Sequence, residues 1–146
     1  MKKLFINTRY LIVPVMSIVT ILGLVSGGIN VFIGDNAGRS NTTGGNNMFI
    51  GYRAGLNSTT ANFNIGLGNF AGQSITTGTI NTFLGYQVAS AVTSGERNVM
   101  LGYQSGWAST TGSYNTFLGM RTGRVNGVGQ FNTYVGTDAG RFNEGD

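Results

Sequence analysis

The strongest constraint on this chain is a repeat of 17 residues that is kept without a slip. Seven times an asparagine stands four residues before a glycine. The asparagines are Asn30, Asn47, Asn64, Asn81, Asn98, Asn115 and Asn132, and the glycines are Gly34, Gly51, Gly68, Gly85, Gly102, Gly119 and Gly136. A strict period this short is typical of stacked supersecondary units. Because the repeat covers residues 30–146, one unit determines the fold of nearly the whole chain.

Every unit has the same order of residue types, which we number from 1 at the asparagine to 17. Position 3 is usually phenylalanine, position 4 is isoleucine, leucine or valine, positions 8 and 9 are small, and positions 13 and 14 are mostly threonine. This order predicts a short strand, a glycine-marked bend, a second short stretch and a polar corner. Such a unit is too short for a helix pair. The sequence therefore predicts an all-β fold, a β-solenoid (β-roll) of seven coils stacked at about 4.8 Å.

The asparagines at position 1 are predicted to form a structural ladder. A side-chain amide at the same place in every coil can hydrogen-bond along the axis, and we expect each amide to donate to the next coil, from Asn30 to Asn132. Glycine at the bends is explained by a positive φ or by close approach of neighbouring coils.

The strand is apolar on both of its alternating faces. Phe117 and Leu118 point to opposite sides, and both positions are apolar in nearly every unit. The residue before the asparagine adds further apolar side chains to the leucine side, namely Phe63, Ile80, Tyr114 and Phe131. We assign the leucine side to the interior and the phenylalanine side to the exterior, so Leu118→Asp is predicted to destroy coil stacking. An outward row of aromatics needs cover, which predicts a homotrimer, with a dimer as the next alternative.

The repeat pattern resembles that of a known group of proteins. The order Asn-Thr-Phe-Leu-Gly-Tyr-Gln followed by Thr-Thr-Gly-Ser-Tyr, as found within residues 81–119, resembles the Asn-Thr-x-Ile/Leu-Gly-Tyr β-roll repeats of phage tail fibres and bacterial surface proteins. More loosely, it is similar to the β-roll heads of trimeric autotransporter adhesins. The resemblance covers residues 30–146 and implies a trimeric β-roll at a surface, used for attachment or as a shaft.

Residues 1–29 differ in character from the repeat. Lys2, Lys3 and Arg9 precede an uncharged apolar run at residues 10–25, which contains Pro14. One interpretation is a signal peptide, cleaved after Gly27 or Gly28 or left uncleaved. The other, which we take as the prediction, is a retained hydrophobic helix that anchors the chain in a membrane through residues 10–25. The basic N-terminal side would then stay inside, and residues 30–146 would project outside, from a virion or a bacterial cell surface.

Composition argues against several classes of function. There is no cysteine and no histidine, and the five acidic residues form no recurrent pair, so neither a catalytic site nor a metal or cofactor site is expected. The net charge of +4 includes three basic residues among the first nine, and the repeat itself has six arginines against five acids. Without a basic stripe, nucleic acid is not an expected partner. Three arginines near the C-terminal end could bind an anionic glycan, although solvated surface charge is the preferred explanation: Arg121, Arg124 and Arg141.

The sequence thus favours a structural or adhesive spike or fibre, a membrane-anchored trimer that is not an enzyme. Two alternatives remain open. One is a subunit of a self-assembling extracellular filament, joined through the open strand edges at the solenoid ends. The other is a secreted solenoid that binds ice through its threonine corner, or a glycan. For a cell-surface glycan or receptor, the candidate ligand surface consists of exposed aromatic residues, Tyr52, Tyr86, Tyr103 and Trp107.

Overall fold

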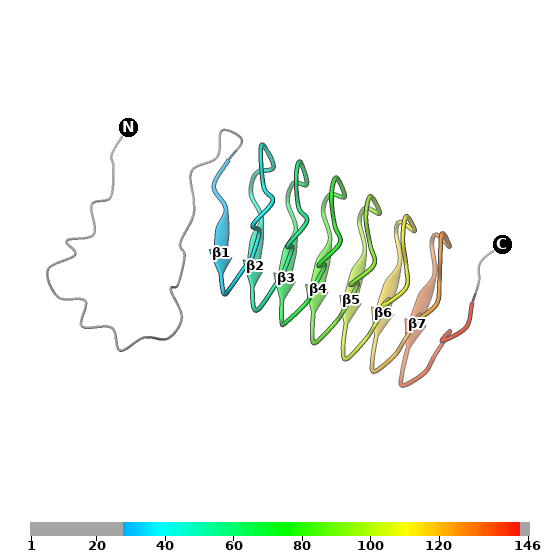
Figure 1. The fold of residues 1–146 in the computed structure, drawn as a ribbon. Coiled ribbons are helices and arrows are strands. Elements are labelled where there is room, and N and C mark those ends of the chain that lie inside the picture. The colour runs from blue at the N-terminus through cyan, green and yellow to red at the C-terminus, as the bar shows by residue number, and fades with distance from the viewer. Residues whose placement is uncertain (1–27, 144–146) are drawn as a thin grey trace, which may run out of the picture.

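The structure, a computed structural model, describes residues 28–143, and these form a β-solenoid (Figure 1). Seven strands of three residues each lie in one parallel sheet in chain order. They are β1 (Val31–Ile33), β2 (Met48–Ile50), β3 (Ile65–Leu67), β4 (Thr82–Leu84), β5 (Val99–Leu101), β6 (Thr116–Leu118) and β7 (Thr133–Val135). The solenoid makes about six turns, and no helix occurs within residues 28–143. The prediction of an all-β solenoid is therefore confirmed.

The register of the sheet follows the repeat directly. Each strand pairs with the strand 17 residues later, so that equivalent positions meet, as Phe32 meets Phe49 and Ile33 meets Ile50. The backbone between strands is also bonded from coil to coil; for example, the amide of Gly38 donates to the carbonyl of Ala54 at 2.9 Å. Neighbouring coils are thus joined around their whole circumference, which fixes the position of every side chain along the axis.

Each strand ends at the glycine of position 5, which turns the chain out of the sheet. These glycines have φ values from +113° to +140°, a region that residues with a side chain rarely adopt. The coils also approach closely here: a Cβ atom on Gly85 would lie 2.6 Å from the carbonyl oxygen of Gly102 in the next coil. Glycine at position 5 is therefore required both by the turn and by the stacking.

A matched pair of substitutions separates these two requirements. Gly136, in the last coil, has φ +113°, but a Cβ atom on it would meet no other part of the described chain within 4 Å. Gly136→Ala is expected to cost about 1–3 kcal/mol from backbone strain alone. Gly85→Ala is expected to cost more, because it adds contact with the backbone of the next coil. Urea unfolding of the two variants measures the difference, and equal losses would show that coil approach does not constrain position 5.

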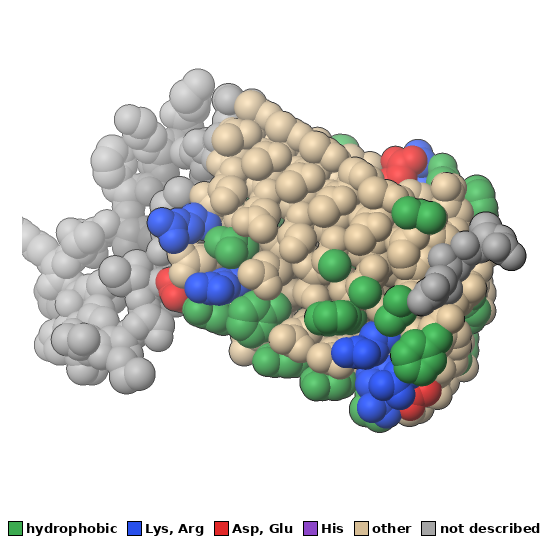
Figure 2. Space-filling view, turned by 45° about the vertical axis from the view of Figure 1, so that its right-hand side comes forward, with side chains coloured by type: hydrophobic (Ala, Val, Ile, Leu, Met, Phe, Trp, Pro, Cys, Tyr) green, Lys and Arg blue, Asp and Glu red, His purple; other side chains and the backbone are tan. Residues whose placement is uncertain are grey.

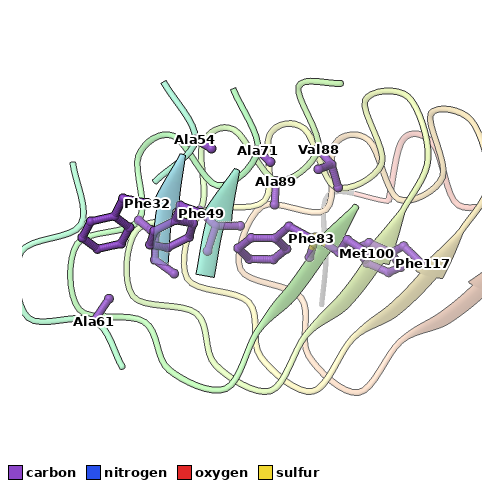
Figure 3. Close-up of a cluster of buried hydrophobic side chains, with 12 residues drawn as sticks. Phe32, Phe49, Ala54, Ala61, Ala71, Phe83, Val88, Ala89, Met100 and Phe117 are labelled. Carbon is purple, nitrogen blue, oxygen red and sulfur yellow. The ribbon is translucent and has the colours of Figure 1, made fainter. Parts of the chain in front are cut away.

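The core is a single file of large side chains at position 3, flanked by small ones. Phe32, Phe49, Phe83, Met100 and Phe117 are at most 3% exposed, and Figure 3 shows them in a row along the axis. Buried small residues at positions 8 and 9 face the row, among them Ala54, Ala71, Val88 and Ala89. A Cβ on Gly38, at position 9, would lie 2.6 Å from the Phe32 ring, so the ring packs directly on the opposite backbone.

This arrangement reverses the predicted assignment of the two apolar faces. Phe117 is buried, whereas Leu118 is only partly buried and Leu84, its equivalent in β4, is 45% exposed. The residues expected on the inside with leucine are exposed as well: Phe63, Ile80, Tyr114 and Phe131. The physical reason is that the narrow coil has room for a large side chain only where small residues lie opposite, and they lie opposite position 3. The prediction that Leu118→Asp destroys stacking is accordingly replaced by one for position 3.

One coil departs from the pattern, and its neighbours compensate. In β3, position 3 is Gly66, and the ring of Phe83 in the next coil lies near Gly72, 2.8 Å from where its Cβ would be. In the other phenylalanine-containing coils, the position 9 glycine meets the ring of its own coil instead. Because the Phe83 ring lies towards Gly72 of the preceding coil, it leaves room at position 9 of its own coil. That position is Ala89, whose backbone has φ +51° and whose side chain adds a Cβ atom. Ile75, at position 12 of the β3 coil, is fully buried and adds apolar volume to the core of this coil.

The predicted N-terminal anchor lies outside the described residues, because the structure describes nothing before Gly28. In the part of the chain that is described, no helix is long and apolar enough to span a bilayer.

Candidate binding surface

The asparagines of position 1 form a buried hydrogen-bonded ladder. The side-chain amide of Asn64 donates to the side-chain oxygen of Asn47 at 3.0 Å and to the carbonyl of Gly78 at 2.9 Å. Its own side-chain oxygen accepts the backbone N–H of Asn81 at 3.0 Å. The amides donate to the preceding coil, opposite to the expected direction. Both ends of the side-chain amide are used inside the rod, so the six buried asparagines from Asn30 to Asn115 hold coils together and are not accessible to a ligand. Asn132, in the last coil, is only partly buried.

A second ladder runs along the threonine corner. At position 13, the hydroxyl of each threonine donates to the carbonyl of the equivalent residue in the next coil, at 3.0 Å for Thr42 to Thr59 and 3.3 Å for Thr110 to Gly127. These hydroxyl protons are therefore used along the axis. The row at position 14, which includes Thr43, Thr60 and Thr77, is the more exposed of the two rows at this corner.

The three candidate tyrosines lie together in one aromatic row. Tyr52, Tyr86 and Tyr103 follow β2, β4 and β5 at position 6, and each is between 37% and 47% exposed. The β3 coil has asparagine at that position, and Phe70 at position 7 fills the gap. The centroid of its ring lies 5.2 Å from that of Tyr52 and 5.9 Å from that of Tyr86, both edge to face. Tyr86 and Tyr103 then stack at 5.8 Å.

Phe70 was missed from the sequence because it stands one position later than the tyrosines. A comparison of positions 6 and 7 together would have found it, since the β3 coil has its aromatic residue at position 7 where the β2, β4 and β5 coils have theirs at position 6. Position 7 has a positive φ in every coil, +61° at Phe70 and +54° at Arg53, so this backbone conformation is not special to Phe70. The aromatic row gives four neighbouring π-faces and edges along one corner of the rod, a surface on which planar or sugar rings can stack.

Trp107, the fourth candidate, does not belong to this row. It stands at position 10, and the guanidinium carbon of Arg124 in the next coil lies 4.8 Å from its ring centroid. Arg121 belongs to the sixth coil and Arg141 to the seventh. Their guanidinium nitrogens lie 2.8 and 3.4 Å from carboxylate oxygens of Asp138. The structure thus places Trp107 beside Arg124, one of three arginines in the last two coils.

Exposed apolar side chains also gather on the outward side of the sheet. This strand face consists of positions 17, 2 and 4 of each unit. Its most exposed apolar members are Met48, Phe63, Ile65, Ile80, Leu84, Val99, Tyr114, Phe131 and Val135. Arg97 is the one charged residue at these positions between residues 28 and 143, and it is paired with Glu96 at 3.0 Å. The strand face is therefore largely apolar and nearly uncharged over the length of the rod.

Within residues 28–143, no group of histidine, cysteine, aspartate or glutamate side chains is arranged to hold a metal ion. Comparison of the sequence with protein-family models, with curated proteins and with solved structures gave no match.

Proposed function

We propose that this chain is a structural or adhesive subunit of a surface spike or fibre, in which three copies associate through the strand face. One observation carries the proposal: the phenylalanine row completes the core within one chain, yet the outer side of the same sheet is apolar over all seven strands. Parallel sheets normally have both faces covered. A patch of this extent on a soluble protein marks an association surface.

A second copy of the chain is the cover that fits best. The strand face is repetitive, and its side chains recur at the coil spacing, so a second strand face can match it coil for coil. Homo-oligomers usually adopt closed symmetry, which a trimer satisfies. In this proposal residues 10–25 anchor the chain in a membrane, and the rod projects outward from a virion or a cell surface as a shaft or an attachment protein.

The mass of the native assembly tests this proposal. The full chain in a mild non-ionic detergent is expected to run as a trimer, and the mass of the intact chain reports whether the N-terminal segment is retained. Ile80→Glu combined with Leu84→Glu places two charges on the strand face and is expected to dissociate the trimer, since both side chains are about half exposed in the single chain.

The matched control is Thr77→Glu combined with Ser94→Glu, which adds the same charge at the exposed threonine corner. It is expected to remain trimeric. A wild-type monomer, or a trimer that survives the strand-face change, would contradict association through this surface.

A filament is the second candidate, and the ends of the solenoid favour it. At the C-terminal end of the described solenoid, Phe131, Val135 and Phe142 are each 66–71% exposed. Exposed strand edges invite the addition of another copy. Filament growth would appear in the same measurement as an open series of masses without a trimer endpoint.

A further inference from the structure

The C-terminal end of the rod carries a compact group of basic side chains. This arginine cluster consists of Arg121, Arg124 and Arg141 with Asp138, and it adjoins Trp107. Figure 2 shows basic side chains gathered at this end of one face, next to an acidic side chain and to hydrophobic ones. Residues 17 apart stack, so position 10 brings together Trp107, Arg124 and Arg141, and position 7 brings together Arg121 and Asp138. The cluster exists only because three coils are stacked.

The guanidinium groups are held in place before any ligand arrives. The carboxylate of Asp138 lies 2.8 Å from Arg121 and 3.4 Å from Arg141, so one acid bridges two bases. Arg124 lies over the indole of Trp107 at 4.8 Å. The side chains of Arg121 and Arg141 are 32% and 31% exposed. Side chains that are already ordered lose little conformational entropy on binding, which favours affinity.

The charges of the cluster do not balance. Among residues 115–143, three arginines stand with one acid, Asp138, an excess of two positive charges; Arg121 and Arg141 pair with its carboxylate, whereas Arg124 lies over Trp107. Two further acids, Glu144 and Asp146, follow in the sequence outside the described residues. The pair formed by Glu96 and Arg97 shows the balanced arrangement: one acid, one base, and the same stacking of arginine over an aromatic ring, 5.2 Å from Tyr114. An unbalanced, preorganised group of arginines is suited to bind an added carboxylate or sulfate, because guanidinium forks match both.

We propose that the arginine cluster and Trp107 form a binding site for an acidic polysaccharide. The acid group of one sugar binds the guanidinium groups, and the sugar ring lies against the indole, which is 36% exposed. Nucleic acid fits less well, because its regular phosphates need a basic track. Beyond the cluster, the described chain carries Arg39, Arg53 and Arg97 against Asp35 and Glu96, an excess of only one. The site lies within single chains and does not depend on the proposed trimer.

Binding is measured by calorimetry on the full chain in a non-ionic detergent, with three hexasaccharides. Hexagalacturonate supplies carboxylates, a chondroitin sulfate hexasaccharide supplies carboxylates and sulfates, and maltohexaose is neutral. We expect the acidic sugars to bind with an affinity that falls as salt rises, and maltohexaose not to bind. The comparison of the two acidic sugars identifies the preferred anion. Arg124→Gln combined with Arg141→Gln is expected to weaken binding about tenfold or more.

Arg97→Gln is the control, because Arg97 stacks on an aromatic ring but stands in a balanced pair with Glu96. The affinity of this variant for the acidic sugars is expected to match that of the wild type. Glu144→Gln combined with Asp146→Asn removes acids that follow closely in the sequence, and equal or tighter binding is expected.

The proposal is overturned if neither acidic sugar binds, if maltohexaose binds as well, or if the double arginine variant keeps full affinity. It is also overturned if a single-stranded oligonucleotide of equal charge binds as tightly, or if neutralising Glu144 and Asp146 weakens binding. Because oligomer mass is a separate measurement, failure here leaves the proposed assembly intact.

Discussion

Phe83→Asp is expected to prevent formation of the solenoid, whereas the same change at its neighbour, Leu84→Asp, is expected to leave the solenoid folded. Both residues belong to β4, but Phe83 is fully buried and Leu84 is 45% exposed. Removing a buried phenylalanine side chain costs about 3–5 kcal/mol, and an unpaired buried charge adds to this cost. Total stabilities of domains are only about 5–15 kcal/mol, so Phe83→Asp removes most or all of the stability.

Leu84→Asp changes a half-exposed position and is expected to cost about 1 kcal/mol, the range spanned by β propensity. Far-UV circular dichroism of the two variants under native conditions distinguishes them: the β signal is lost in one and retained in the other. Because adjacent residues receive the same new side chain, composition and charge are matched. Loss of the fold in the Leu84 variant alone would support the opposite assignment, with leucine inside and phenylalanine outside.

Asn81→Ala is expected to be strongly destabilising although it changes a polar position. The amide of Asn81 donates to the side chain of Asn64 at 3.0 Å and to the carbonyl of Gly95 at 2.8 Å. Its oxygen accepts the backbone N–H and the side-chain amide of Asn98, both at 3.0 Å. Alanine removes all four bonds. The carbonyl of Gly95 and the N–H of Asn98 then lose these side-chain partners inside the rod, at about 1–3 kcal/mol for each group.

We therefore expect Asn81→Ala to lower the free energy of unfolding by about 2–6 kcal/mol, measured by urea denaturation. Asn57→Ala, at an exposed position outside the ladder, is expected to change it by about 0.5 kcal/mol or less. Asn132→Ala is an intermediate control, because within residues 28–143 the side chain of Asn132 makes only the longer contacts of 3.4 Å to Asn126 and 3.3 Å to Tyr134. Equal losses at Asn57 and Asn81 would show that the ladder does not stabilise the fold.

Predictions from the sequence succeeded where exact repetition was sufficient. Once equivalent positions must stack, the period places every strand, as the register from Phe32 to Phe49 and from Phe117 to Tyr134 shows. The prediction failed where a property of the whole coil was needed. Alternation correctly separated Phe117 from Leu118, but hydrophobicity could not choose between them, because both positions are apolar. Asn115 stands two residues before Phe117, so the two side chains point to the same face of the strand. A hydrogen-bonded asparagine ladder that is expected to be buried would therefore have indicated that the phenylalanine face is the inward one.

The candidate surface shows the same division. Tyr52, Tyr86 and Tyr103 could be chosen from the sequence, because they share one position of the repeat. Phe70 was not chosen in this way, because it stands at position 7, and only the ring contacts with Tyr52 and Tyr86 show that it belongs to the row. Trp107 was grouped with the tyrosines by residue type alone, whereas its partner in the structure is Arg124.

The amino-acid sequence by itself determined the all-β repeat, the boundaries of its units and the stacking of equivalent residues, because translation by a constant period leaves no other register. Only the tertiary structure decided which apolar side faces inward and which surfaces remain exposed. The direction in which the chain turns after each strand is set by the backbone at the position 5 glycine and by the room that small residues leave opposite position 3. The arginine cluster likewise depends on stacking, since its members come from successive coils and become neighbours only when the rod has formed.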